Sequence, residues 1–442
     1  MREKLNTMHP MWLWAGAATV LALLLAAALL FSSGAHTAVS YDGASATQPA
    51  SDVQAYIAPT VPPAPPPSVH LPAPEHIHAI YMSACAAGTP SYRESLESLI
   101  KNASAPHLNA IVIDVKDFSG GISFPTSNPT LAPFVSGKCG AKDMRSYIAK
   151  LHSENIYVIA RITTFQDPLY TKAHPDQAVQ KKGGGVWTDN HGLAFVDVGA
   201  KPFWEYIATL GKESYNLGFD ELNFDYVRFP SDGPMSLAVY SWDKGKTKSE
   251  ALEAFFQHLN GELKPTGAKM SADLFGMTTT NEDDLNIGQV LERALPYFDF
   301  IDPMVYPSHY PTGFNNYKDV NAHAYDIVHF SLARAVERAI APTTTVEAFD
   351  EKPITEIGTP SSTTPPQVYE KPVFAASKIR PWLQSFDYPV PYTPAMVKEQ
   401  IKATNDAGLE DWIFWDAANK YTSLREVLGR TPPATPATTT VE

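Results

Sequence analysis

The sequence has no long run of lysine and arginine beyond its N-terminus, and basic residues are outnumbered by acidic ones. It contains 34 Lys and Arg residues against 47 Asp and Glu residues, a formal net charge of -13 at pH 7. Nucleic-acid-binding proteins need clustered positive charge to neutralise phosphates. The composition therefore argues against nucleic acid as a partner, and it suits a neutral or cationic substrate.

A glycine-rich phosphate loop is also missing. No GxGxxG motif follows the first strand-like segment, and the triple glycine Gly183–Gly185 lies far from any expected strand-to-helix junction. Such a loop is typical of dinucleotide-binding open sheets. Its absence weighs against an open doubly wound sheet, the main alternative among alternating α/β folds.

An uncharged apolar run occupies residues 11–31. At about 1.5 Å per residue, it is long enough to span a hydrocarbon core of about 30 Å. Arg2 and Lys4 precede the run and should stay in the cytoplasm. We therefore expect a cytoplasmic N-terminus over 1–10 and a transmembrane signal anchor, which makes this a single-pass membrane protein with an extracytoplasmic body. A cleaved signal peptide ending near Ser33–Ala35 is the alternative.

Three stretches are rich in Pro, Ala and Thr and have too few large apolar residues to form a core. We expect a disordered linker over 32–75, a disordered insertion over 341–373 and a disordered tail over 431–442. The remaining body, 76–430, alternates between strand-like and helix-like segments. The expected strands are 78–82, 110–115, 156–160, 219–225, 269–274, 298–304, 379–384 and 412–415. Eight strands alternating with helices predict a (β/α)8 TIM barrel.

The stretch from Gly218 to Pro230 places polar side chains where a buried strand should be apolar. In an extended chain Glu221, Asn223 and Asp225 share one face. Carboxylates also stand near the ends of other expected strands, and in a closed barrel they would converge on one mouth. These residues are Asp114, Asp225, Asp273, Asp302 and Asp416.

Convergent carboxylates rimmed by aromatic side chains favour glycoside hydrolysis. One carboxyl group protonates the leaving oxygen, and another attacks or activates water. His76 and His78 form an HxH pattern, but the pair precedes the first strand, and the fourth and fifth strands offer no Lys or His as further ligands. We therefore expect neither a metal nor another cofactor.

Seven ordered motifs resemble those of the bacterial putative glycoside-hydrolase domain family, over roughly 76–428. They are DVKD (114–117), YVIARITTFQDP (157–168), FDYVRFP (224–230), SADLFG (271–276), IDPMVYPSHY (301–310), IRPWLQSF (379–386) and WIFWDAANKYT (412–422). The resemblance implies a TIM barrel distantly similar to α-amylase-type enzymes and a carbohydrate substrate.

The same resemblance implies catalytic roles. Asp225 would be the nucleophile or base, and Asp273 the acid, where α-amylase-type barrels carry a Glu. Asp302 is the other contender for the acid. Glu221 is expected deeper and structural, paired with Lys269. The expected substrate contacts are Asp114, Lys116, Arg161, Arg228, Tyr306, His309, Trp382, Gln384, Trp415 and Asp416.

Two alternatives stay open at this point. A non-catalytic carbohydrate-binding barrel of the cell envelope would have the same aromatic rim, and a polysaccharide deacetylase would require a bound metal. Cysteine is scarce, and the state of the pair Cys85 and Cys139 is open as well. An oxidising exterior would allow a disulfide, and two free thiols are the alternative.

Overall fold

The computed structural model describes residues 68–103, 107–346 and 367–429. The expected transmembrane anchor at 11–31, most of the linker and the expected tail lie outside these residues. Within the described ranges, no helix combines the length and the apolar character that a membrane crossing requires.

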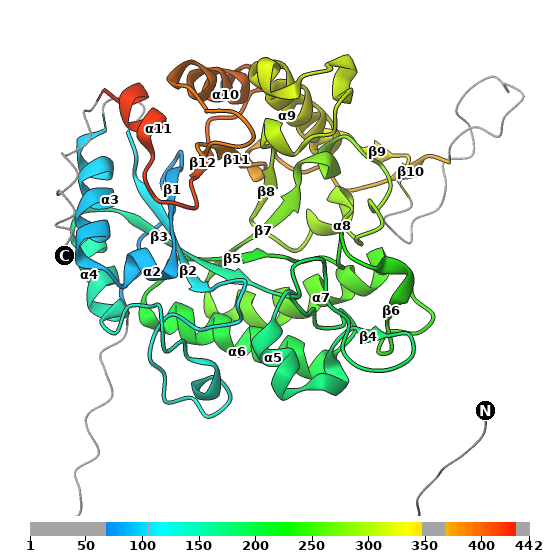
Figure 1. Ribbon diagram of the computed structural model, residues 1–442. Coiled ribbons are helices and arrows are strands. Elements are labelled where there is room, and N and C mark those ends of the chain that lie inside the picture. Colours follow the sequence, from blue (N-terminus) through cyan, green and yellow to red (C-terminus); the bar gives the residue numbers. More distant parts are fainter. Residues whose placement is uncertain (1–67, 104–106, 347–366, 430–442) are drawn as a thin grey trace, which may run out of the picture. The chain divides into compact units, whose positions relative to one another are not determined.

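Eight parallel strands close into a barrel, which confirms the predicted (β/α)8 fold (Figure 1). Their order around the barrel is β1-β12-β11-β8-β7-β5-β3-β2. The strands are β1 (His78–Met82), β2 (Ala110–Lys116), β3 (Tyr157–Thr163), β5 (Glu221–Asp225), β7 (Lys269–Phe275), β8 (Phe300–Met304), β11 (Trp382–Gln384) and β12 (Trp412–Trp415). Closure removes the exposed sheet edges and brings all carboxyl ends of the strands to one mouth.

The seventh barrel strand is shorter than the sequence predicts. Residues 379–384 were expected to be extended, but β11 begins at Trp382. Pro381 has no backbone N–H to donate, so only its carbonyl takes part in the ladder, accepting from Ile413 of β12 at 2.9 Å. Before it, Ile379 forms only an isolated bridge to Ile301 of β8.

Helices surround the strands and bury an apolar stripe against them (Figure 1). They are α2 (Ala84–Ala87), α3 (Pro90–Asn102), α4 (Met144–Ser153), α5 (Pro168–Ala173), α6 (Lys201–Leu217), α7 (Lys248–Leu263), α8 (Leu291–Ala294), α9 (Ala324–Ile340), α10 (Pro394–Asp406) and α11 (Thr422–Val427). Within residues 287–295 only the short helix α8 forms. Gly288 has φ +85°, outside helical geometry.

Local sequence explains where two of the helices begin. Thr247 and Glu250 form a reciprocal capping box at the start of α7, with each side chain bound to the other residue's backbone N–H. At α10, Thr393 caps the helix and Pro394 occupies its first turn, where a missing N–H costs no helical hydrogen bond.

The polar face of β5 points into the barrel, as the alternation predicted. Glu221, Asn223 and Asp225 are all buried, and Leu222 and Phe224 on the other face belong to the core between strands and helices. In the parallel register, Asn223 lies beside Arg161 of β3 and Ser271 of β7. Polar side chains from three adjacent strands therefore meet inside the barrel.

The insertion expected to be disordered over 341–373 is ordered at both of its ends. Thr343–Thr344 (β9) pairs antiparallel with Tyr369–Glu370 (β10). The reason is packing against the barrel wall: Lys371 donates to the carbonyl of Ala339 at 3.1 Å. Residues 347–366 lie outside the described residues. A second small sheet joins Gln180–Lys181 (β4) to Ala238–Val239 (β6).

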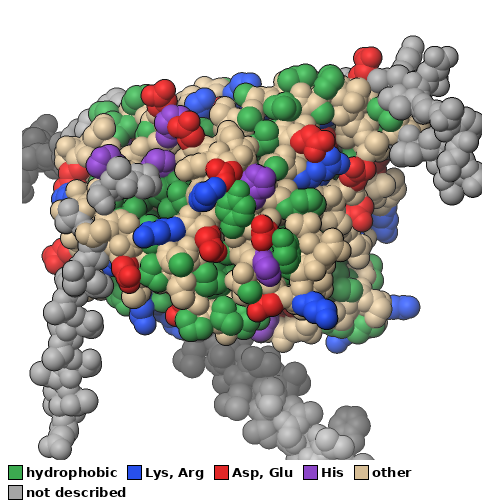
Figure 2. Space-filling view, turned by 90° about the horizontal axis from the view of Figure 1, so that it is seen from above, with side chains coloured by type: hydrophobic (Ala, Val, Ile, Leu, Met, Phe, Trp, Pro, Cys, Tyr) green, Lys and Arg blue, Asp and Glu red, His purple; other side chains and the backbone are tan. Residues whose placement is uncertain are grey.

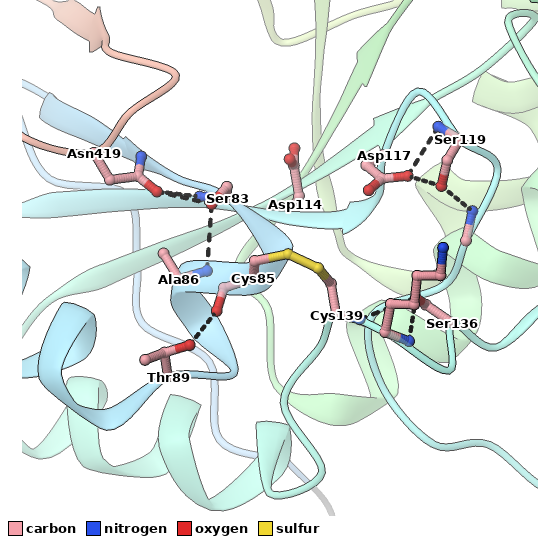
Figure 3. The surroundings of a disulfide bond; sticks show 12 residues. Ser83, Cys85, Ala86, Thr89, Asp114, Asp117, Ser119, Ser136, Cys139 and Asn419 are labelled. Atoms are coloured by element: carbon pink, nitrogen blue, oxygen red, sulfur yellow. Dashed lines mark hydrogen bonds between the residues drawn. A yellow bond between two sulfur atoms is a disulfide. The ribbon is translucent and has the colours of Figure 1, made fainter. Parts of the chain in front are cut away.

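Cys85 and Cys139 form a disulfide, which resolves the choice left open by the sequence (Figure 3). Their Cα atoms lie 4.4 Å apart. Cys85 is in α2, directly after β1, and Cys139 is in the loop between β2 and α4. The bond therefore ties together the first two loops at the carboxyl ends of the strands.

Candidate active site

One arginine organises the carboxylates at the barrel mouth. Arg161, on β3, donates from Nη1 to Asp114 at 2.6 Å and from Nη2 to Asp225. Its Nε lies 3.8 Å from Oδ2 of Asp273. We call these four residues the Arg161 cluster. Burial disfavours the charge of Arg161, but Asp225 and Asp114 outweigh this and hold its pKa well above the ordinary value.

The carboxyl group of Asp225 accepts hydrogen bonds from two donors. Besides Arg161, the backbone N–H of Tyr226 donates to its Oδ1 at 2.5 Å. Tyr226 has φ +52°, a left-handed conformation that is unfavourable for a bulky residue. The chain turns sharply directly after β5, and this turn aims the N–H of Tyr226 back at the carboxylate that ends the strand.

Asp273 lies in a different environment. It is only 1% exposed, and its Oδ1 accepts hydrogen bonds from Trp382 Nε1 at 2.7 Å and Asn223 Nδ2 at 2.8 Å. Burial raises the pKa of Asp273 well above its usual range, and the neighbouring charges of Asp225 and Asp302 raise it further. Because both N–H donors use Oδ1, the proton of the acid form belongs on Oδ2.

A second arginine cluster lies deeper in the barrel. Arg380 is fully buried and bridges Asp302 and Glu221, with contacts of 2.7 Å and 2.5 Å from Nη2. Ser271 also donates to Glu221, at 2.6 Å. We call Arg380, Glu221 and Asp302 the Arg380 cluster. The expected pairing of Glu221 with Lys269 is wrong, because Lys269 reaches outward to Asp299 at 2.8 Å and Arg380 takes its place.

The two clusters together hold five carboxyl groups against two guanidinium groups. If all five were ionised, the barrel interior would carry three uncompensated negative charges, which burial makes costly. Three of the five carboxyl groups have raised pKa values. Burial raises the pKa of Asp114 and Asp273, and it raises that of Asp302 to about 6. These three carboxyl groups therefore take up a proton more readily than an exposed Asp does.

A cavity of about 360 Å³ opens onto the Arg161 cluster. This volume is in the range of small-ligand sites. Eight of the expected site residues line it: Arg161, Asp225, Arg228, Asp273, Tyr306, His309, Trp382 and Trp415. The aromatic rim also includes Tyr226, Phe275 and Tyr310, so a sugar ring would meet flat apolar faces beside the two carboxyl groups.

Trp415 lies between the charged and aromatic parts of the wall. Its ring stacks on Tyr81 at 3.9 Å between centroids and lies edge-on to Trp382 at 5.6 Å. The guanidinium carbon of Arg161 is 4.8 Å from the Trp415 ring centroid. These contacts fix the ring beside the carboxylates.

A wider basin of about 1110 Å³ adjoins the first cavity. Tyr306, His309 and Trp415 line both, so the two are continuous. Burial lowers the pKa of His309, which favours a neutral imidazole at this junction. Asp416 also lines the basin, but its carboxylate accepts the backbone N–H groups of Ala418, Lys420 and Tyr421 and shapes the loop after β12.

The remaining expected contacts lie away from the cavity. Asp302 is fully buried in the Arg380 cluster, and Asp114 sits behind Arg161 with its second oxygen bound by the Tyr81 hydroxyl. The side-chain amide of Gln384 accepts from the Ser308 hydroxyl and donates to the carbonyls of Phe386 and Tyr388. These three residues support the site from behind.

Lys116 shows why alternation alone misplaces a residue. It should share the inward face of Asp114, but the ladder between β2 and β3 shifts register between these two positions. The Lys116 side chain leaves the barrel interior and forms a buried ion pair with Asp167 at 2.8 Å. A bulge of this kind re-aims the residues that follow it.

Sequence reasoning missed several residues that shape the site. Asn223 was noted on the polar strand but given no role, although its amide reaches Ser271, Asp273 and Asp302. Arg380 was not considered at all. Its signal was available, since an arginine within an otherwise apolar barrel strand needs a buried anionic partner.

Histidines 76 and 78 lie at the opposite, amino end of the barrel. Both ring nitrogens of His78 contact backbone carbonyls, those of His107 and Glu410, each at 3.0 Å. Among the described residues, no group of three or more His, Cys, Asp or Glu side chains is arranged to hold a metal ion.

Comparison with known families identifies the domain. A family described as "Putative glycosyl hydrolase domain" matches residues 79–421. The chain belongs to this family. It therefore carries a glycosyl hydrolase domain, which confirms the family resemblance and makes the protein a glycoside hydrolase whose substrate is unknown. No curated protein matches the chain.

A solved structure with a TM-score above 0.5 shares the fold. The glycoside hydrolase domain of PgaB (BpsB) from Bordetella bronchiseptica is 14% identical, with 80% of this chain and 99% of that chain covered and a TM-score of 0.51. A hypothetical protein from Ruminiclostridium thermocellum ATCC 27405 is 28% identical over 47% of this chain and 98% of that chain (TM-score 0.40). The spore cortex-lytic enzyme SleL from Bacillus megaterium QM B1551 is 12% identical over 84% and 77% (TM-score 0.43).

Proposed function

We propose that the protein hydrolyses glycosidic bonds of a poly- or oligosaccharide with Asp273 as the general acid and Asp225 as the nucleophile or base. The contrast between the two carboxyl groups carries the proposal. Asp225 is bound by Arg161 and a backbone N–H, whereas Asp273 is desolvated and faces two other acids. A carboxyl group whose raised pKa retains its proton is suited to act as the acid, and a neighbouring carboxyl group paired with a guanidinium is suited to act as the nucleophile or base.

The reaction follows from these positions. Asp273 donates its proton to the glycosidic oxygen as the bond to the anomeric carbon breaks. Asp225 either attacks that carbon or takes a proton from an attacking water. When Asp273 loses its proton, the Nε of Arg161, which has no hydrogen-bond partner in the described part of the chain, is placed to stabilise the new carboxylate. Asp302 lines no cavity, so we assign it no chemical step.

The shape of the site supports a substrate of more than one sugar. The cavity beside the carboxylates continues past Trp415 into the wider basin. A bond held at Asp225 and Asp273 would then have sugar units on the basin side, where tyrosines and exposed backbone offer stacking and hydrogen bonds.

We also propose that the barrel works outside the cytoplasm, anchored by residues 11–31. The Cys85–Cys139 disulfide supports this location, because such bonds persist in oxidising compartments. Protease treatment of intact cells tests it. Digestion of the barrel in intact cells is expected, and a protected barrel would contradict the proposal.

The catalytic assignment is tested with a panel of polysaccharides and the variants Asp225→Asn and Asp273→Asn. Each should lower turnover by about 10²-fold or more while glycan binding persists. Asp326→Asn, at an exposed position on α9, is the matched control and should keep full activity. Retained turnover in both site variants would contradict the assignment. Binding without turnover by the unaltered protein would favour the non-catalytic carbohydrate-binding barrel.

A further inference from the structure

Arg228 stands apart from the other buried arginines. Five arginines are buried in the described part of the chain: Arg161, Arg228, Arg338, Arg380 and Arg425. Each of the other four makes at least two side-chain hydrogen bonds, to carboxylates or to several carbonyls. Arg228 makes one, from Nη1 to the carbonyl of Phe229 at 3.0 Å.

The guanidinium of Arg228 is held in place by aromatic rings rather than by counterions. Its central carbon lies 4.9 Å from the ring centroid of Tyr226, 4.8 Å from Phe275 and 5.6 Å from Phe195. Cation–π contacts of this kind fix the orientation of the group but leave its full charge in place. The rings therefore position a planar, charged fork without neutralising it.

No carboxylate of the described residues lies within ion-pair distance of Arg228. Asp225, Asp232 and Asp189 favour its charge only from farther away. Asp225 is already bound by Arg161, and Asp189 accepts the backbone N–H groups of His191 and Leu193. Arg228 is only 7% exposed, and burial lowers its pKa. Such a buried, uncompensated charge is costly unless a partner arrives from outside.

A partner bound in the catalytic cavity can reach Arg228. Arg228 lines the same cavity as Asp225 and Asp273. On the outside of the protein, acidic and basic side chains are interspersed over the face shown in Figure 2. With a net charge of -13, the protein does not attract anions over long range, so recognition of an anion depends on this local group.

We propose that Arg228 binds an anionic substituent of the substrate, a carboxylate, sulfate or phosphate group on a sugar bound in the cavity. A guanidinium presents two parallel N–H groups that match the oxygens of such an anion. The substrate class is thus an acidic glycan. The inference rests on the proposed function, since it places the anion on a sugar bound beside Asp225 and Asp273.

Matched glycan pairs test the inference by calorimetry, with the full chain in detergent and Asp225→Asn present to prevent turnover. The pairs are oligogalacturonate and its carboxyl-reduced form, chondroitin sulfate oligosaccharide and its desulfated form, and phosphomannan oligosaccharide and its phosphatase-treated form. In at least one of these glycan pairs, the anionic member should bind at least about tenfold more tightly. This is the gain in affinity expected from one charge-assisted hydrogen bond. The pair that shows the preference identifies the anion.

Substitutions then assign the preference to Arg228. Arg228→Gln should reduce it to less than twofold, and Arg228→Lys should keep part of it because the charge remains without the fork. Arg334→Gln, at a partly exposed position on α9 outside the cavity, is the control and should leave the preference intact. Thermal unfolding curves check that each variant is folded.

The outcomes separate this inference from the proposed function. No preference for the anionic member in any pair, or a preference that survives Arg228→Gln, overturns the inference. Anionic preference in a protein that hydrolyses none of the glycans supports the inference and contradicts the proposed catalysis. Hydrolysis of a neutral glycan, with no preference for anionic glycans, supports the proposed catalysis and contradicts the inference about Arg228.

Discussion

The indole N–H of Trp382 donates a 2.7 Å hydrogen bond to Asp273, and this contact joins β11 to β7, the next strand but one around the barrel. Trp382 itself is almost fully buried. A donor to a carboxylate stabilises its ionised form and so lowers its pKa. Trp382 therefore limits how far burial can raise the pKa of Asp273.

Replacing Trp382 by Phe should shift the pH profile of hydrolysis. The proposed acid works when protonated, so activity is lost as pH rises through its raised pKa. Trp382→Phe removes the N–H but keeps an aromatic ring, and it should raise that pKa further. The alkaline limb of kcat/KM should then move to higher pH. Trp412→Phe, at the amino end of the barrel, is the control. An unmoved or lowered limb would contradict the role of Trp382.

A second prediction concerns Arg380. Arg380→Met leaves Glu221 and Asp302 buried without their shared cation. Breaking a buried ion pair from one side costs about 3–5 kcal/mol of unfolding free energy. Chemical denaturation should show a loss of this size. The matched variant Arg380→Met with Glu221→Gln and Asp302→Asn removes the stranded charges and should recover most of it. An equal loss in both variants would show that shape, rather than charge, is responsible.

How far the sequence predicts this interior depends on what fixes each side chain. Alternation along β5 correctly placed Glu221, Asn223 and Asp225 on the inner face, because strand geometry is local. The choice of counterion is not local. Whether Lys269 or Arg380 meets Glu221 depends on how the strands are staggered around the closed barrel. That stagger brings a residue 159 positions away along the chain to within 2.5 Å.

Irregular backbone also limits what the sequence predicts about side-chain direction. The register shift after Asp114 sends Lys116 out of the barrel interior, and Pro381 delays β11, so neither follows the two-residue period of a strand. The left-handed turn at Tyr226 likewise cannot be predicted from residue type, since bulky residues rarely adopt it. These features decide which polar residues face the cavity, and each depends on tertiary packing.

A third prediction follows from Asp302, whose pKa is raised to about 6 by burial. In the unfolded chain an Asp titrates near 3.9. Between about pH 4 and pH 6 the native state therefore holds a proton that the unfolded state has lost. Stability from this group is present at low pH and falls as pH rises through this window. Unfolding free energies measured across it should fall less steeply for Asp302→Asn than for the unaltered protein.

The charge of Asp302 also raises the pKa of Asp273. Asp302→Asn removes that charge, so the pKa of Asp273 is raised less. The stability that Asp273 loses with rising pH then also becomes smaller, and the unfolding free energy of Asp302→Asn depends still less on pH. Parallel stability curves for the two proteins would contradict the titration of Asp302 in this range.

The last prediction concerns the disulfide between the first two loops at the mouth. Cys85 and Cys139 are 54 residues apart in the sequence, and closing a loop of this length restricts the unfolded chain. The expected contribution to the free energy of unfolding is about 2–4 kcal/mol. The double variant Cys85→Ser, Cys139→Ser should lose that amount, and reductant should destabilise the unaltered protein but not the variant. Alkylation of the unfolded protein should add mass only after reduction, and labelling of both cysteines without reductant would contradict the bond. Because the bond joins loops beside β1 and β2 rather than β5 and β7, hydrolysis below the melting temperature should survive its loss.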